Sequence, residues 1–165
     1  MISFLALALG LATAVVTDVR TRRIPNWLTG AIAGAGFGLA FGGGSVTPWQ
    51  AALGMLVGLV LMLPGHVIGA TGAGDVKLMA AVGVFLGPGL VFRAFLYSAL
   101  AGGVLALIVA ARRGLLTDTM VGTTQLVTSP SVATRDAIVA PGRRNRFAYG
   151  PAIAAGTLIT LLVHP

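Results

Sequence analysis

The sequence predicts an all-α membrane protein, a bundle of about six transmembrane helices with both termini non-cytoplasmic. Its 165 residues are 56% hydrophobic and only 9% charged, and the mean hydropathy is +0.95. Soluble globular domains contain about 25% charged residues. Six apolar segments explain the difference, because a membrane-spanning helix needs about 20 apolar residues. These segments are residues 1–17, 28–41, 49–70, 76–92, 94–111 and 148–163.

The first segment is followed at once by Asp18 and by the basic residues Arg20, Arg22 and Arg23. It has no positive n-region and no small-residue cleavage site, so we expect a retained helix rather than a secretory signal. Asp18 then lies near the end of this helix. It is either a functional acid or a counter-ion for the three arginines.

The second segment follows the sequence Ile24-Pro25-Asn26. Proline disfavours a helical conformation in the residue before it and suits the first turn of a helix. Pro25 therefore predicts a fixed turn with the second helix beginning at that point.

Glycine recurs at every fourth position in several apolar segments, which places the glycines on one face of a helix. Small residues at this spacing let membrane helices approach closely. We expect these faces to pack against neighbouring helices, and a cleft for a substrate helix is the alternative. The glycines concerned are Gly30, Gly34, Gly38 and Gly42, then Gly54 and Gly58, Gly65 and Gly69, and Gly83 and Gly87.

The junction before the fourth segment contains Gly69, Gly72 and Gly74, followed by Asp75 and Lys77. So many glycines are unfavourable for continuing a helix, and non-helical backbone at membrane depth needs protein or water to satisfy its polar groups. Asp75 is therefore either a functional acid beside such a cavity or the cap of the fourth helix. Lys77 could stabilise the charge of Asp75, hold a substrate, or extend to the membrane surface.

The longest polar connection, about residues 112–147, separates the fifth segment from the last. Loops of this length tend to be functional or disordered, and the sequence leaves both open. Its residues Arg143, Arg144 and Arg146 are explained by membrane topology, with a contact to anionic lipid or an acidic partner as the alternative. No polar stretch is long enough for another folded domain, so residues 1–165 are expected to form a single domain.

The distribution of basic residues predicts the orientation of the helices. Ten of the eleven lie in the connections after the first, third and fifth segments, and only Arg93 lies in another connection. Cytoplasmic loops carry such an excess of Lys and Arg. These three connections are therefore expected in the cytoplasm. The same distribution explains the net charge of +7 without nucleic-acid binding, which we do not expect.

Asp18 and Asp75 are two of only four acidic residues in the chain. Ionisable groups at membrane depth are costly, so they are candidates for function. The predicted topology brings both to the cytoplasmic boundary. Two carboxylates held close cannot both ionise readily, and such a pair supplies a general acid and a general base together.

Two motifs in this order resemble the type IV prepilin peptidase family of GxGD aspartic intramembrane peptidases. The first is Asp18 followed by Ile24-Pro25-Asn26, and the second is Gly72-Ala73-Gly74-Asp75-Val76-Lys77. Phe147-Ala148-Tyr149-Gly150-Pro151 is also similar to that family's entry to its last helix, with Ala148 where proline is common. Longer members begin with a cysteine-bearing cytosolic segment linked to N-methylation. This chain has no cysteine and resembles the short, peptidase-only Flp (tad-type) branch.

The resemblance implies that Asp18 and Asp75 are catalytic. It also implies that the active-site loop and substrate approach contain Gly72, Gly74, Lys77, Pro25 and Asn26. The implied substrate is the helix of a prepilin or pseudopilin, whose basic leader is removed after a glycine at the cytoplasmic face of the bacterial inner membrane. Membrane lipid is the other expected partner, and N-methyltransferase activity is not expected.

No metal or other cofactor is expected, because the chain lacks cysteine and His66 has no Cys or Glu nearby. A packing or hydrogen-bonding role is favoured for His66. Two alternative functions stay open at this point. One is a small transporter or channel that uses the aspartates as proton or cation sites, although internal repeats are not evident. The other is a non-catalytic membrane assembly subunit. The sequence does not indicate an oligomeric state.

Overall fold

The computed structural model describes residues 2–112 and 149–164, and every regular element in these ranges is a helix. The predicted all-α class is therefore confirmed for the part of the chain that the structure describes. The helices are α1 (Ile2–Thr21), α2 (Asn26–Phe41), α3 (Pro48–Val67), α4 (Ala73–Arg112) and α7 (Gly150–Val163). The predicted loop of residues 112–147 lies, beyond Arg112, outside the described residues.

Among the described residues, three helices are long and apolar enough to cross a membrane, namely Ile2–Thr21, Pro48–Val67 and Ala73–Val109. The helix Gly150–Val163 is apolar but shorter. Large hydrophobic side chains are exposed along these helices, for example Leu9 and Leu56. Such a surface is suited to lipid. The protein is therefore a helical membrane protein, while six spans and the orientation of the termini stay predictions.

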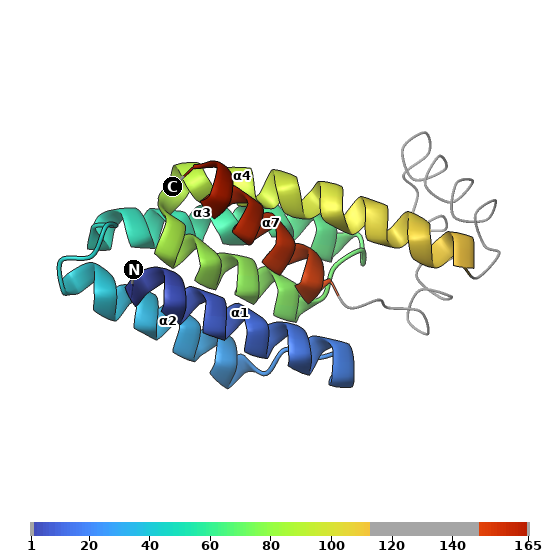
Figure 1. Ribbon diagram of the computed structural model, residues 1–165, viewed down its shortest axis with the longest axis horizontal. Helices are drawn as coiled ribbons and strands as arrows, with labels where there is room; N and C mark the ends of the chain where they lie inside the picture. The colour runs from blue at the N-terminus through green and yellow to red at the C-terminus, as the bar shows by residue number, and fades with distance from the viewer. Residues whose placement is uncertain (1, 113–148, 165) are drawn as a thin grey trace. The chain divides into compact units, whose positions relative to one another are not determined.

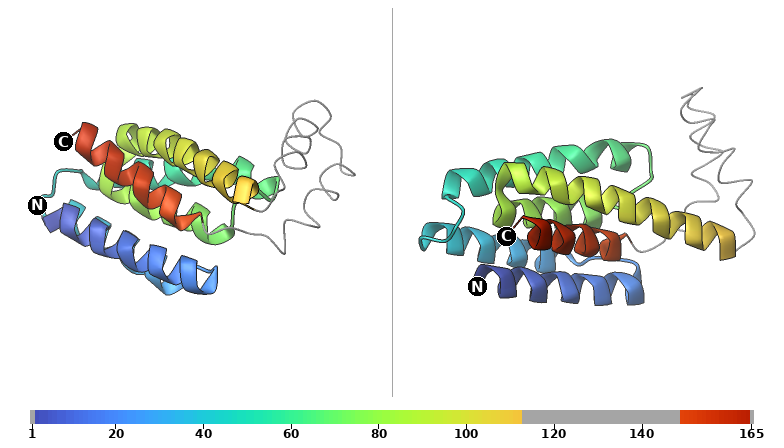
Figure 2. Two further views of the ribbon diagram at one scale, coloured as in Figure 1. Left: turned by 45° about the vertical axis from the view of Figure 1, so that its right-hand side comes forward. Right: turned by 45° about the horizontal axis from the view of Figure 1, so that its top comes forward.

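Helix α4 is interrupted at Gly87, whose backbone has φ 72° and ψ 177°. This left-handed φ suits glycine, and Pro88 follows without an N–H to continue the helical hydrogen bonds. Figures 1 and 2 show that the chain turns back at the start of the yellow-green part of α4. The predicted boundary between residues 76–92 and 94–111 was wrong. Arg93 lies within the second half of α4 rather than in a connection.

The glycine faces behave differently from one another. A Cβ added to Gly54 or Gly58 would meet the backbone of Gly83 or Met79, so α3 and the first half of α4 are in backbone contact there. The expected packing is confirmed at this contact. The prediction for the face of α2 was wrong, because a Cβ at Gly30, Gly34 or Gly38 would meet nothing within 4 Å. Spacing defines a face, but a neighbouring helix has to be present to use it.

The helices relevant to the site belong to one compact unit of Met1–Gly102 and Ala148–Pro165. Its main core contains Leu7, Leu78, Met79 and Ile153, all almost completely buried. Figure 1 shows the start of α1 and the end of α7 at one end of this unit. The turn between α1 and α2, the turn between α3 and α4, and the start of α7 gather at the opposite end.

Candidate active site

Asp18 lies in the last turn of α1 and is only 5% exposed. Its Oδ2 atom accepts a hydrogen bond of 2.8 Å from the backbone N–H of Gly150, the first residue of α7. The N-terminal N–H groups of a helix have no partner within the helix and readily bind carboxylates. A Cβ on Gly150 would come within 2.8 Å of the same oxygen. Glycine at this position therefore permits the close approach.

Asp75 lies in the first turn of α4 and is 8% exposed. Its Oδ2 atom accepts a hydrogen bond of 2.8 Å from the backbone N–H of Gly72, just before the helix. This is the contact that the third residue of a helix makes when it caps the helix start. Asp75 thus caps α4, which is one of the two interpretations that the sequence left open. Capping also fixes the orientation of the carboxylate.

The segments that carry the two acids are in direct contact. A Cβ on Gly74 would lie 3.2 Å from Cβ of Ile24, so the first turn of α4 packs against the turn between α1 and α2. The Lys77 Nζ atom donates a hydrogen bond of 2.8 Å to Oδ1 of Asn26, across 51 positions of sequence. Pro25 is the residue immediately before α2 rather than part of its first turn. The structure therefore brings together Lys77 and Asn26, one predicted site residue from each motif.

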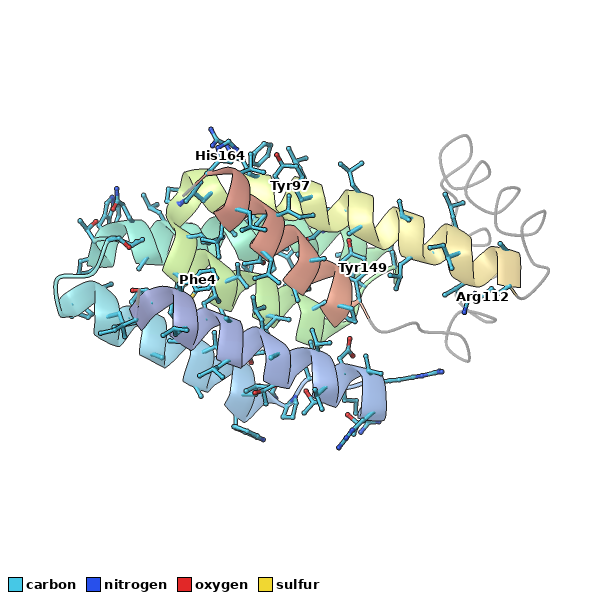
Figure 3. All side chains as sticks on the ribbon, in the orientation of Figure 1. Phe4, Tyr97, Arg112, Tyr149 and His164 are labelled. Carbon is cyan, nitrogen blue, oxygen red and sulfur yellow. The ribbon has the colours of Figure 1, made fainter. Side chains whose placement is uncertain are left out.

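Tyr149 connects this arrangement to the second half of α4. Its hydroxyl donates a hydrogen bond of 3.2 Å to the carbonyl of Ser98, and its ring lies against Gly102. Burial raises the pKa of the Tyr149 phenol, and the nearby charge of Asp75 raises it further. Figure 3 labels Tyr149 beside the start of α7. Tyr149 and its neighbour Gly150 are thus associated with the two different acids.

Neither Tyr149 nor Gly150 was among the predicted site residues. The signal that could have identified them is the sequence around Tyr149-Gly150-Pro151, which was noted only as a helix entry. Its contact with Asp18 spans 132 positions. A contact over that separation depends on how the helices pack, and no local pattern encodes it.

The other predicted groups lie outside this arrangement. The side chains of Arg20, Arg22 and Arg23 are exposed, whereas the carboxylate of Asp18 is buried on the Gly150 amide. The structure therefore supports the Gly150 amide, rather than the three arginines, as the partner of the Asp18 carboxylate. Arg143, Arg144 and Arg146 lie outside the described residues.

His66 has a local structural role at the end of α3. Its Nδ1 atom lies 3.2 Å from the carbonyl oxygen of Thr71, within hydrogen-bond distance. Across the described ranges, no group of three or more His, Cys, Asp or Glu side chains gathers that could hold a metal ion. The chemistry available at this end of the helices is that of two buried carboxylates, backbone amides and a phenol.

The fold and the site together define a helical membrane protein with two buried acids at one end of its helices. Residues 5–107 match the model of the type IV leader peptidase family, and this range includes both Asp18 and Asp75. The match covers more than half of the chain, so the protein belongs to this family, and its chemistry is that of a peptidase. No curated protein and no solved structure matches this chain.

Proposed function

We propose that this protein is an aspartic endopeptidase that removes the basic leader from type IV prepilins or pseudopilins of the Flp class. The observation that carries the proposal is the pair of buried acids, Asp18 and Asp75, each of which accepts a hydrogen bond from the backbone N–H of a glycine, Gly150 and Gly72. They are also the only acidic residues within the described ranges. Family membership supplies the peptidase class.

The proposed reaction uses the two carboxyl groups as an acid and a base. The ionised aspartate accepts a proton from water while the water oxygen forms a bond to the scissile carbonyl carbon. The protonated aspartate donates its proton to the leaving amide nitrogen as the carbon–nitrogen bond breaks. One proton is taken up and one is released, so the pair ends the reaction with its shared proton. Neither a metal ion nor a covalent intermediate takes part.

The proposed place of cleavage is the cytoplasmic boundary of the bacterial inner membrane. Exposed basic residues Arg20, Arg22, Arg23 and Lys77 lie in the segments next to the acids, as expected for a cytoplasmic face. Trp27, at the same end of α2, is also exposed. Tryptophan side chains favour the membrane–water interface, so this end of α2 is suited to that boundary. A helical substrate would have to unwind locally at this boundary, because its peptide bonds are otherwise occupied in internal hydrogen bonds.

The proposal does not extend to methylation of the new N-terminus. The resemblance associates that reaction with a cysteine-bearing segment, and the 165 residues contain no cysteine. The expected product is therefore a mature pilin with a free amino group. Mass spectrometry of the processed pilin would detect an added methyl group directly.

The test is co-expression with a Flp-type prepilin, with processing followed by electrophoretic mobility. Asp18→Asn and Asp75→Asn are each expected to abolish cleavage while the protein still inserts in the membrane. The matched controls are Asp118→Asn and Asp136→Asn, which remove the other two acids of the chain. Normal cleavage by an inserted Asp18→Asn or Asp75→Asn variant would refute the two-aspartate mechanism. Intact processing combined with altered ion flux would instead identify a transporter.

A further inference from the structure

The start of α7 contacts Asp18 directly and lies near Asp75. The Gly150 amide holds Asp18 of α1, while the Tyr149 phenol lies within the electrostatic reach of Asp75 of α4. Asp18 and Asp75 belong to different helices, α1 and α4. The position of the Asp18 carboxylate relative to α4 therefore depends in part on where the start of α7 lies. This segment lies beyond residues 5–107, the range that matches the family.

Tyr149 is anchored on the second half of α4 by two contacts. The hydroxyl donates to the Ser98 carbonyl at 3.2 Å, and the ring lies so close to Gly102 that a Cβ there would overlap it. Ser98 is itself fully buried, with its Oγ atom donating to the Ala94 carbonyl at 2.6 Å. The phenol is therefore held by a closely packed surface. Its backbone continues directly into the amide that binds Asp18.

We propose that Tyr149 and Gly150 are positioning residues for the aspartate pair. Tyr149 fixes the start of α7 on α4, and Gly150 then presents its amide to Asp18 at a fixed place relative to Asp75. This inference rests on the proposed peptidase function. It adds that the pair becomes catalytically competent only when α7 is seated. Neither residue is assigned a proton-transfer step or a bond to the substrate.

The geometry gives the expected size of the effect. A Cβ at position 150 would lie 2.8 Å from Oδ2, 3.3 Å from Cγ and 3.2 Å from Cβ of Asp18. Ordinary contact begins at 3.4 Å, so the Asp18 carboxylate would have to move relative to the Gly150 amide. Misplacing a catalytic group by about 1 Å can cost roughly 100-fold in rate. Gly150→Ala is therefore expected to lower kcat by roughly 10- to 100-fold.

The experiment measures kcat and KM of the full-length enzyme in detergent, with a purified Flp-type prepilin as the substrate. The amplitude of the thermal unfolding transition gives the amount of folded enzyme, and kcat is expressed per folded molecule. Tyr149→Ala should lower kcat by roughly 10-fold with KM changed less than about twofold. Tyr149→Phe keeps the ring on Gly102 and should recover most of that loss. The matched controls are Tyr97→Phe, for the other tyrosine, and Gly34→Ala, whose Cβ would enter open space.

Several results would overturn the inference. One is unchanged kcat in folded Tyr149→Ala and Gly150→Ala. Another is a raised KM at constant kcat, which would make Tyr149 a substrate-binding residue. A third is a loss in Tyr149→Phe as large as in Tyr149→Ala. If Gly150→Ala does not fold, the Tyr149 series decides alone. Failure of wild-type enzyme to cleave, or cleavage by Asp75→Asn, would refute the proposed function itself and this inference with it.

Discussion

The contact between α3 and the first half of α4 provides a direct test of how glycine packs this bundle. Gly83 of α4 faces Gly54 of α3, and both are buried. A Cβ on Gly83 would lie 2.5 Å from the carbonyl carbon of Gly54 and 3.0 Å from the nitrogen of Met55, with the Gly54 oxygen closer still. All of these are backbone atoms. No flexible side chain can move aside, so Gly83→Ala has to separate the two helices.

The size of that separation follows from the distances. The carbon–carbon approach of 2.5 Å falls 0.9 Å short of the 3.4 Å at which ordinary contact begins. Opening an interface by 0.5–1 Å forfeits about a quarter to a half of the dispersion energy of each atom pair. Membrane helices have no hydrophobic drive to offset this loss. Overpacking typically costs about 1–3 kcal/mol, and we expect Gly83→Ala to lower the free energy of unfolding by about 2 kcal/mol.

The assay is reversible unfolding in mixed micelles of mild and denaturing detergent, followed by circular dichroism. The matched control is Gly34→Ala in α2, where a Cβ would meet nothing within 4 Å. Alanine is a better helix former than glycine, so this control is expected to gain about 0.5–1 kcal/mol. Equal stability of Gly83→Ala and Gly34→Ala would refute the argument that backbone contact at Gly83 holds the two helices together.

Three further predictions concern the site end of the helices. Lys77→Met and Asn26→Ala should each lower the free energy of unfolding, because each removes the hydrogen bond between their segments. A double-mutant cycle should give a coupling energy of about 0.5–1.5 kcal/mol, and additive effects of the two substitutions would exclude the hydrogen bond. Arg22 has φ 53°, so Arg22→Gly should raise the free energy of unfolding by about 1 kcal/mol in the same unfolding assay, whereas Arg22→Ala should not. Absorbance titration of Tyr149, with the other tyrosine replaced by Phe, should give a phenol pKa above 10.0. The pKa should be lower in the Asp75→Asn variant. Because the folded state holds this proton more tightly than the unfolded chain, stability should fall as pH rises above about 10, and Tyr149→Phe should reduce that loss.

Local features of the sequence were sufficient for the elements and for the candidate acids. Apolar segments predicted helices near α1, α2, α3 and α7 to within a few residues. Pro25 and the glycines around Gly72 marked the turns on either side of the site, because backbone restrictions of this kind act over one or two residues. Asp18 and Asp75 stood out because an ionisable group is costly beside an apolar helix.

The turn at Gly87 was missed because the boundary was placed from hydropathy and from Arg93. Gly87-Pro88-Gly89 is itself a local turn signal, but it lies inside an apolar stretch, and hydropathy carries no information about a backbone φ of 72°. The glycine faces were ambiguous for a related reason. Gly34 and Gly54 have the same four-residue spacing, yet only Gly54 meets another helix.

The sequence by itself determined that this protein is helical, that it belongs in a membrane, and that Asp18 and Asp75 are its candidate functional acids. Those properties follow from composition and from short motifs. Only the tertiary structure decided that Lys77 meets Asn26 and that the Gly150 amide binds Asp18 across 132 positions. These contacts depend on which helix faces pack together. That choice is made by the shapes of all the helices at once, and no single segment contains it.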